Sequence, residues 1–459
     1  MKKSNSWFSR SNSKSDITVL QPSEIKVTFE SLIGMETAKE EVKDVVEYIK
    51  NPTKFDNLGI RPHMHYLLQG SDGVGKSSLV YAVAKSANIR IVVVDCKSFI
   101  VSRQKAFKLL KNSFNIANSY NYSVLLLKDF SRLFQINEAF KLSFLSKLIA
   151  LMKECSNVVV FTTLSCLLTF LNGEYLFDED AFSKTVDILE PDLKTREELY
   201  KLFCKDIPVD EGISFMRLAI DSYGMTPKDI KRIVKDATLL SARKGSETVK
   251  REHFDEILSN ELLGQKRKKM TEKDRASTAY HEAGHVVAGY FSDPEYKLSK
   301  VEIIHRSDSL GITMQENDED KLSIFKSDYE KRIISLLGGI AAERLIFGEN
   351  SSGVISDLSA ATTCGKLMVA SCGMCDEFGI FSVYFESSDD NDSFTILKTT
   401  SDNLRDEINT NVRKILAQCY ETTFNILKEH RKELEALTQA LLEKEIVYGN
   451  EIKEIFDHC

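Results

Sequence analysis

The sequence predicts an α/β fold with a parallel sheet and flanking helices, followed by a small helical bundle and then a mainly α-helical domain. Three observations predict it. The first 190 residues alternate short apolar runs with helical stretches, the pattern turns helical after Pro191, and 459 residues exceed what one hydrophobic core usually holds. We therefore expect two or three domains.

Four short apolar runs predict the strands of the sheet, at residues 66–70, 89–96, 123–129 and 157–163. Each run is continuous and rich in β-branched residues or leucine, which is typical of strands buried on both faces of a parallel sheet. Helical stretches separate the runs, as crossover connections require. Residues 27–190 are therefore predicted to form a doubly wound α/β domain.

The remaining boundaries follow from changes in pattern. Residues 191–263 predict a helical lid, whose last long helix starts at Pro227 and ends before Gly245. The basic run at 264–270 lacks an apolar period and predicts a linker, and residues 271–459 form the last domain, with a long amphipathic helix over 402–445. Residues 1–26 predict a disordered tail, although their serine-rich, mildly basic start is also compatible with a targeting peptide.

Composition excludes some classes of function. The net charge of -7 leaves no surplus of lysine and arginine for a nucleic-acid backbone, so no nucleic-acid partner is expected. No apolar run approaches the ~18 to 20 residues of a transmembrane helix, and the start lacks a secretory signal. The nine cysteines therefore predict reduced thiols inside a cell, in the cytosol or an organelle matrix. The Cys372/Cys375 pair is too weak a signal for a metal or redox site.

A phosphate-binding loop follows the first predicted strand. The sequence fits GxxxxGK[ST] at Gly70, Ser71, Asp72, Gly73, Val74, Gly75, Lys76 and Ser77 and continues into a helix at Ser78. Backbone amides of such a loop converge on phosphate oxygens, Lys76 reaches the outer phosphates, and the Ser77 hydroxyl suits Mg²⁺. The sequence therefore predicts binding of ATP or ADP; the alternative is a glycine-rich turn that binds nothing.

Hydrolysis of the nucleotide is less well supported. It needs a Mg²⁺-organising acid and a water-polarising acid after a second buried strand, and that strand is followed here by Lys128 and Asp129. A lysine at this position should repel Mg²⁺. Asp129 remains the candidate for a role in Mg²⁺ binding or hydrolysis, and efficient turnover is not expected.

A second motif predicts a metal site. His281, Glu282 and His285 form HExxH within a stretch whose apolar residues recur at helical spacing. Residues four apart share one face of a helix, so both imidazoles can bind one Zn²⁺, while Glu282 can take a proton from a water and pass it to the leaving amine. The alternative is a helix with two surface histidines. A third ligand is needed, and chemistry alone leaves four candidates: Asp293, Glu343, Asp357 and His305.

Over residues 27–455 the sequence resembles the FtsH-type AAA+ zinc metalloproteases. The resemblance is carried by VTFESLIGMETAKEEVKDVVEYIKNPTKFDNLGIR, GMTPKDI, STAYHEAGHVVAGY, VEIIHR followed by SLGITM, GGIAAERLIFGE, and SDLSAATTCGKLMVASCGM. It implies that Asp357 is the third zinc ligand and that Glu343 lies in a helix supporting the site. It also implies a hexameric ring, homomeric or mixed, that unfolds polypeptides and cleaves them in an internal zinc chamber, usually anchored in a membrane.

The sequence departs from this family in its nucleotide-dependent motor. The acidic pair is replaced by Lys128 and Asp129, and the sensor asparagine by Leu164 or Ser165. The segment 177–184 has no arginine, and the substrate-gripping loop is missing after Phe99 and Ile100. These departures make ATP-driven unfolding doubtful.

Three functional hypotheses follow. The leading one is a zinc endopeptidase for unfolded or damaged polypeptides, with one Zn²⁺ per subunit and bound nucleotide but impaired hydrolysis. The second is a non-catalytic assembly subunit of a protease ring. The third is a fully ATP-dependent protease in which another acid replaces the missing one. Peripheral association with a membrane is compatible with all three.

Overall fold

The computed structural model describes residues 16–100, 103–135, 138–165, 182–263, 270–305, 311–315, 323–383, 385–387, 394–396 and 401–459. The predicted tail up to residue 15, the linker at 264–269 and the segment 177–181 lie outside these residues. The chain divides into two compact units, residues 1–254 and 255–459.

The first unit contains a six-stranded sheet in the order β1-β3-β4-β5-β2-β6. Its strands are β1 (Ile17–Leu20), β2 (His65–Gln69), β3 (Arg90–Asp95), β4 (Ser123–Lys128), β5 (Val158–Leu164) and β6 (Lys184–Asp187). Five strands are parallel, and β1 pairs antiparallel with β3. The four predicted strands are confirmed as β2 to β5. The end of the segment predicted as a tail is ordered, because β1 pairs there with the edge of the sheet.

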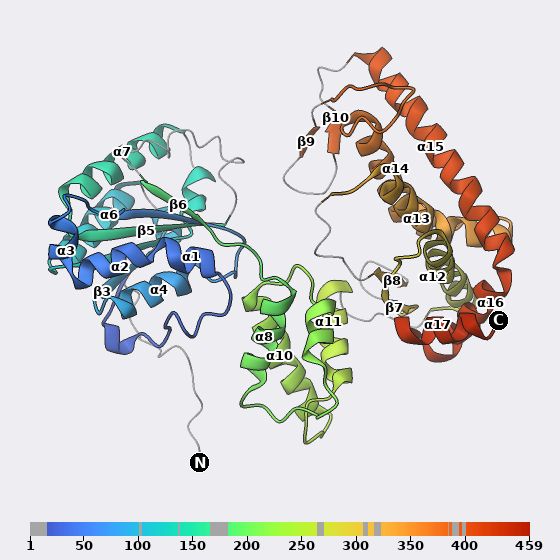
Figure 1. Ribbon diagram of the computed structural model, residues 1–459, viewed down its shortest axis with the longest axis horizontal. Helices are drawn as coiled ribbons and strands as arrows, with labels where there is room; N and C mark the ends of the chain where they lie inside the picture. Colours follow the sequence, from blue (N-terminus) through green and yellow to red (C-terminus); the bar gives the residue numbers. More distant parts are fainter. Residues whose placement is uncertain are drawn as a thin grey trace. The chain divides into compact units, whose positions relative to one another are not determined.

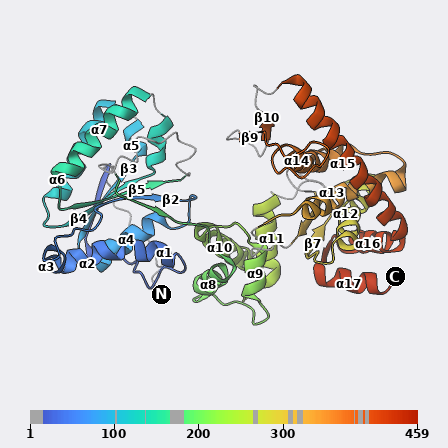
Figure 2. The same ribbon diagram turned by 45° about the horizontal axis from the view of Figure 1, so that its top comes forward.

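Helices cover both faces of this sheet, as Figure 2 shows. They are η1 (Pro22–Glu24), α1 (Glu36–Glu41), α2 (Lys43–Lys50), α3 (Pro52–Asp56), α4 (Lys76–Ser86), α5 (Lys97–Ile100), α6 (Arg103–Asn118), η2 (Phe130–Gln135) and α7 (Glu138–Glu154). Successive strand residues point to opposite faces. Leu126 of β4 therefore packs in the core with α2 and α4, and Leu127 packs with α6 and α7.

Three helices follow the sheet, α8 (Leu193–Cys204), α9 (Phe215–Asp221) and α10 (Pro227–Arg243), and α11 (Arg251–Leu263) spans the boundary between the two units. Thr226 caps α10 by accepting a hydrogen bond from the amide of Asp229, and the proline predicted to start this helix is its first residue. The buried Arg196 of α8 donates to the carbonyl oxygens of Ala219 (2.9 Å) and Pro191 (2.9 Å). This side chain ties α8 to α9.

The second unit is mainly helical (Figure 1). It consists of α12 (Glu272–Ser292), β7 (Leu298–Glu302), β8 (Ile312–Gln315), α13 (Lys326–Phe347), η5 (Ser352–Val354), α14 (Ile355–Ala370), β9 (Phe385–Ser387), β10 (Phe394–Ile396), α15 (Asp402–Glu429), α16 (Arg431–Lys444), β11 (Ile446–Tyr448) and α17 (Gly449–Asp457). Helix α13 packs against α12, α14 and α15. Strands β11, β7 and β8 form a small sheet, in that order, beside α12.

The long helix predicted over 402–445 is two helices. The chain breaks at His430 (φ -100°, ψ 41°), between α15 and α16. The imidazole ring of His430 stacks on Phe291 of α12 with ring centroids 3.5 Å apart. The break lets α16 turn back and pack on α12, so the tertiary contact overrides a continuous helical pattern.

Among the described residues, no helix combines the length and apolar character needed to span a lipid bilayer.

Candidate metal centre and phosphate loop

Helix α12 carries the HExxH residues near its middle. Thr271 caps the helix by accepting a hydrogen bond from the amide of Asp274. His281, Glu282 and His285 are all buried, although their side chains are polar. The two imidazole rings lie one turn apart on the same face, with centroids separated by 4.7 Å. Buried histidines need polar partners, and these come from neighbouring elements.

Three glycines bring α13 against this face of α12. A Cβ atom on Gly284 would lie 2.4 Å from the carbonyl oxygen of Gly338, and one on Gly338 would lie 2.3 Å from that of Gly284. A Cβ atom on Gly339 would lie 2.5 Å from a ring carbon of His281. Only glycine permits this approach of two helix backbones. The close contact places Ser335 and Glu343 of α13 beside the histidines.

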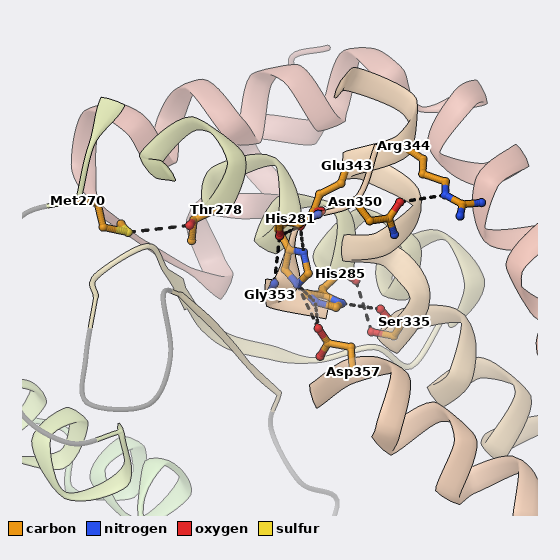
Figure 3. A network of polar contacts seen from close by, with 11 residues as sticks. Met270, Thr278, His281, His285, Ser335, Glu343, Arg344, Asn350, Gly353 and Asp357 are labelled. Carbon is orange, nitrogen blue, oxygen red and sulfur yellow. Dashed lines mark hydrogen bonds and ion pairs between the residues drawn. The ribbon is translucent and has the colours of Figure 1, made fainter. Parts of the chain in front are cut away.

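The histidine pair and Asp357 face one another (Figure 3). The Nε2 atoms of His281 and His285 are 3.1 Å apart, and Oδ2 of Asp357 lies 3.1 Å from the first and 3.6 Å from the second. Ligands held tetrahedrally at about 2.0 to 2.1 Å from a Zn²⁺ ion lie roughly 3.3 to 3.4 Å from each other. The three atoms therefore have the spacing of three corners of a zinc coordination tetrahedron.

The outer hydrogen bonds set the protonation of the two imidazoles. Nδ1 of His281 lies 2.8 Å from Oε1 of Glu343, and Nδ1 of His285 lies 2.8 Å from the carbonyl oxygen of Ser335. Both partners are acceptors, so in the neutral tautomers Nδ1 donates and Nε2 presents a lone pair. Two lone pairs and a carboxylate oxygen then converge without a donor. This arrangement fits a divalent cation.

The carboxylates around the histidines strengthen the preference for positive charge. Burial lowers the pKa of His281, but hydrogen bonds to Asp357 and Glu343 outweigh it, and the pKa lies well above the usual range. Burial raises the pKa of the Asp357 carboxyl, but the hydrogen bonds from His281 and His285 outweigh this effect. They hold the pKa of Asp357 well below its usual range. Without a cation, a proton must therefore occupy this cluster.

A metal ion is usually bound by His, Cys, Asp or Glu side chains. Among the described residues, one group of three such side chains has ligand atoms within 4.8 Å of each other, namely His281, His285 and Asp357. Of the other candidates, Glu343 contacts the far side of His281 and accepts from the Ser351 hydroxyl at 2.9 Å. Asp293 pairs with Lys331 at 2.8 Å, and His305 is not part of the group.

Glu282 lies beside the histidines on α12. Its Oε2 accepts a hydrogen bond of 2.8 Å from the Thr313 hydroxyl of β8, and a Cβ atom on Gly311 would lie 2.8 Å from its Cγ. Burial raises the pKa of Glu282, against the opposing charges of His285 and His281 and the hydrogen bond from Thr313. The role of Thr313 could not be predicted from the motif, because the separation of Thr313 from HExxH along the chain does not indicate their distance in space.

The phosphate loop lies in the first unit between β2 and α4. Gly70, Gly73 and Gly75 all have positive φ (145°, 100° and 113°), a backbone conformation that favours glycine. The Lys76 ammonium donates to the carbonyl oxygens of Gly70 (2.6 Å) and Ser71 (2.7 Å), within the loop itself. The loop therefore has the bent backbone from which amides can converge on phosphate oxygens.

Two contacts join this loop to the start of α10. Lys228 pairs with Asp72 at 2.8 Å, and a Cβ atom on Gly73 would lie 2.6 Å from the Thr226 hydroxyl. The hydrogen bond from Lys228 lowers the pKa of Asp72, and the charges of Lys76 and Lys128 lower it further. Three lysines are thus close enough to act on the Asp72 carboxylate, while the neighbouring Ser71 hydroxyl donates to Glu190.

Asp129, the candidate for a role in Mg²⁺ binding or hydrolysis, directly follows β4 and has a left-handed backbone (φ 58°). Its amide donates to the Thr163 hydroxyl at 2.9 Å, and its carboxylate lies 3.5 Å from the Lys97 ammonium. Leu164, one of the two residues at the expected sensor position, is buried, whereas Ser165 is exposed and lies within 3.2 Å of the Ser131 hydroxyl.

Comparisons with known proteins match both units. Residues 66–169 match the family model described as "ATPase family associated with various cellular activities (AAA)", and residues 268–455 match "Peptidase family M41". The "ATP-dependent zinc metalloprotease FtsH" of Aquifex aeolicus (strain VF5) is 31% identical over 446 residues, which cover 94% of this chain and 70% of that protein.

Two further relatives match as broadly. The "ATP-dependent zinc metalloprotease FtsH 1" of Rhodopirellula baltica is 29% identical over 96% of this chain and 68% of that protein. The FtsH of Thermotoga maritima is also 29% identical, over 96% of this chain and 75% of that protein. Both family models match, and a relative that is 31% identical aligns with 94% of this chain, so the chain belongs to the FtsH family of ATP-dependent zinc metalloproteases.

Proposed function

We propose that this chain cleaves polypeptides at the metal centre of its second unit, with His281, His285 and Asp357 as ligands of one Zn²⁺ and Glu282 as the general base. The proposal is carried by one observation: Nε2 of His281, Nε2 of His285 and Oδ2 of Asp357 converge, with separations of 3.1 to 3.6 Å. A zinc ion there would lower the pKa of a bound water to about 7 and polarise the scissile carbonyl.

The protein's own groups would orient the ligands and transfer the protons. Glu343 and the Ser335 carbonyl hold the two imidazoles in the tautomers that present Nε2 to the ligand. Glu282 takes the proton of the attacking water and later delivers it to the leaving amine. Thr313 holds one oxygen of Glu282, which fixes the plane of the carboxylate during both transfers.

The experiment that tests this proposal is replacement of Glu282 by Gln, followed by assays of casein cleavage and zinc content. Loss of a general base typically costs about 10²- to 10⁴-fold in rate. We therefore expect cleavage to fall by at least about 100-fold, with zinc retained at one per chain. Glu295→Gln is the matched control, because Glu295 is an exposed glutamate beyond the end of α12.

Each result has a distinct meaning. Unchanged cleavage in the Glu282→Gln protein would exclude the assigned base. A wild-type protein with neither stoichiometric zinc nor peptidase activity would instead support a non-catalytic assembly subunit.

We further propose that residues 70–78 bind ATP or ADP and that hydrolysis is impaired. The positive φ angles of the three loop glycines support binding. The basic Lys128 at the end of β4, and the pairing of Asp129 with Lys97, support impaired hydrolysis, because both acidic functions are weakened. A substantial ATPase rate that disappears on Lys76→Ala would contradict the second part and favour a fully ATP-dependent protease.

The assembly and setting of the protein form the last part of the proposal. The AAA family match supports a ring, which we propose to be a homomeric or mixed hexamer acting on unfolded or damaged polypeptides. The eight described cysteines are all free thiols, and six of them are buried, which supports a reducing cytosol or organelle matrix. Analytical ultracentrifugation with and without ATP would measure the assembly state.

A further inference from the structure

Lys128 lies on the face of the sheet that carries α4. Along β4, Val124 and Leu126 pack in the core with α4, whereas Leu125 and Leu127 pack in the core with α6 and α7. Strand residues alternate between the two faces, so Lys128, two residues after Leu126, belongs to the α4 face. It is the last residue of its strand, and α4 packs directly against β4.

Strand register brings Lys128 towards the phosphate loop. Leu127 is paired with Thr162, so Lys128 comes level with Thr163, and Thr163 is paired with Leu68 of β2. Neighbouring strands lie about 4.8 Å apart, so about 10 Å separates the end of β4 from the strand that leads into the loop. The side chain of Lys128 starts on the side of the sheet where α4 begins with Lys76 and Ser77.

The electrostatics of the loop agree with this placement. Asp72, within the loop, has a pKa lowered by the hydrogen bond from Lys228 and by the charges of Lys76 and Lys128. Lys128 is therefore near enough to the loop to act on its electrostatics.

The groups around this position do not fit a Mg²⁺ ion. A nucleotide-bound Mg²⁺ is usually held by the loop hydroxyl, here Ser77, and by an acid at the end of the neighbouring strand. A lysine occupies the strand end, and the next acid, Asp129, has its carboxylate 3.5 Å from the Lys97 ammonium. An ammonium and a divalent cation competing for the same phosphate oxygens repel each other.

We propose that the Lys128 ammonium takes the place of Mg²⁺ at this site, so that the chain binds ATP or ADP without a divalent cation. The inference rests on the proposed nucleotide binding by residues 70–78. Two lysines, Lys76 from the loop and Lys128 from β4, would neutralise the outer phosphates by charge-assisted hydrogen bonds. The nucleotide would then act as a structural ligand, since the ion that organises hydrolysis is absent from the bound complex.

Calorimetric titration of ATP into the full chain tests the inference. The buffer is passed over a chelating resin, which removes free Mg²⁺, and the zinc content is measured before and after. ATP is then titrated with no divalent ion and with Mg²⁺ in excess. We expect excess Mg²⁺ to leave the dissociation constant unchanged or to raise it, because the ion gains no protein ligand at the site and competes with the Lys128 ammonium for the phosphate oxygens.

Two substitutions sharpen the test. Lys128→Met removes the charge and should weaken Mg²⁺-free binding by about tenfold or more. Lys128→Asp restores an acid at the strand end and should make Mg²⁺ tighten ATP binding by about tenfold or more. Lys111→Asp, an exposed position of α6 on the opposite face of the sheet, makes the same change in net charge and should leave both constants unaltered.

The outcomes separate the two proposals. ATP binding by the wild-type chain that requires Mg²⁺ would overturn the inference about Lys128 and leave nucleotide binding intact. Equal loss of affinity in the Lys111→Asp control would also overturn it, because the effect would then come from net charge alone. Absence of ATP binding under both conditions would overturn nucleotide binding and the inference together.

Discussion

The hydrogen bond from the Thr313 hydroxyl to Oε2 orients the carboxylate of Glu282. The bond is 2.8 Å long and joins β8 to α12. Without it the buried carboxylate can rotate, and a general base displaced by about 1 Å can lose up to about 100-fold in rate. Positioning of the base, rather than substrate binding, should therefore depend on this hydroxyl.

We expect Thr313→Val to lower kcat for peptide cleavage by about tenfold or more, with KM and zinc content nearly unchanged. Thr313→Ser retains the hydroxyl and should recover most of the rate. Steady-state kinetics of the two variants provide the measurement. Equal activity of the valine and wild-type proteins would show that Glu282 is held by other contacts.

The affinity for zinc should depend on pH through His281. In the zinc-free chain its carboxylate partners raise the pKa of this imidazole above the usual ~6.5, so His281 carries a proton at neutral pH. Zinc must displace that proton. The affinity should therefore rise as the pH rises through neutrality, instead of levelling off just above pH 6.5.

Competition titrations with a chromophoric chelator between pH 6 and pH 9 measure this dependence. Asp357→Asn provides the comparison, because it removes the neighbour whose hydrogen bond raises the pKa of His281. In that variant zinc binding should be weaker at every pH and less dependent on pH. A wild-type affinity that is constant above pH 7 would contradict the prediction.

Among the residues of the metal centre, only those within one helical turn of each other can be assigned from their spacing in the sequence. The helical repeat brings His281 and His285 together, so HExxH predicts its own local geometry. Asp357 was assigned through resemblance to a family, since its separation from HExxH says nothing about distance in space. The roles of Thr313 and the Ser335 carbonyl depend on how β8 and α13 pack, and no local pattern marks them.

At the scale of elements, the contact between α12 and α13 supports the metal centre. Gly284 and Gly338 face each other so closely that a Cβ atom on either would lie within 2.4 Å of the opposite backbone. Helix α13 carries both Ser335 and Glu343, the partners of the two imidazoles. Separation of these helices would therefore disturb stability and zinc binding together.

We expect Gly338→Ala to destabilise the chain by about 1 to 3 kcal/mol or more, because the two backbones must move apart. Although alanine has the higher helix propensity, its gain of about 1 kcal/mol is smaller than the cost of the clash. Thermal unfolding with measurement of bound zinc checks both effects. The control is Gly212→Ala, an exposed glycine in the lid, which should change stability little. A stabilised Gly338→Ala protein with normal zinc content would contradict this account.

The elements themselves were largely predictable where a pattern persisted along the chain. Strands β2 to β5 follow from continuous apolar runs, and α10 follows from its proline start and glycine end. The break between α15 and α16 was not predictable. The amphipathic pattern continues through His430, and the helix ends there only where the ring of His430 stacks on Phe291 of another element.

At the scale of the whole molecule, each compact unit carries one proposed ligand site. The phosphate loop belongs to residues 1–254 and the metal centre to residues 255–459. A ligand that binds only the folded form stabilises it by about 2.7 kcal/mol at 100 times its dissociation constant. If the units unfold separately, each ligand should act on its own transition.

Scanning calorimetry with ATP, with zinc and with both ligands tests this expectation. ATP should raise the transition of the first unit and zinc that of the second. Lys76→Ala should abolish the first shift alone, and His285→Ala the second. A single transition that moves with either ligand would show instead that the two units unfold cooperatively.

The sequence by itself determined the α/β module, the helical lid, the phosphate loop and the histidine pair, because each depends on a repeat or spacing within one stretch of chain. Only the tertiary structure decided that Asp357 completes a triangle of ligand atoms, that Thr313 holds Glu282 and that Lys128 points to the α4 face. Those relations join segments distant in sequence. Their geometry is set by helix packing and strand register, which local patterns do not encode.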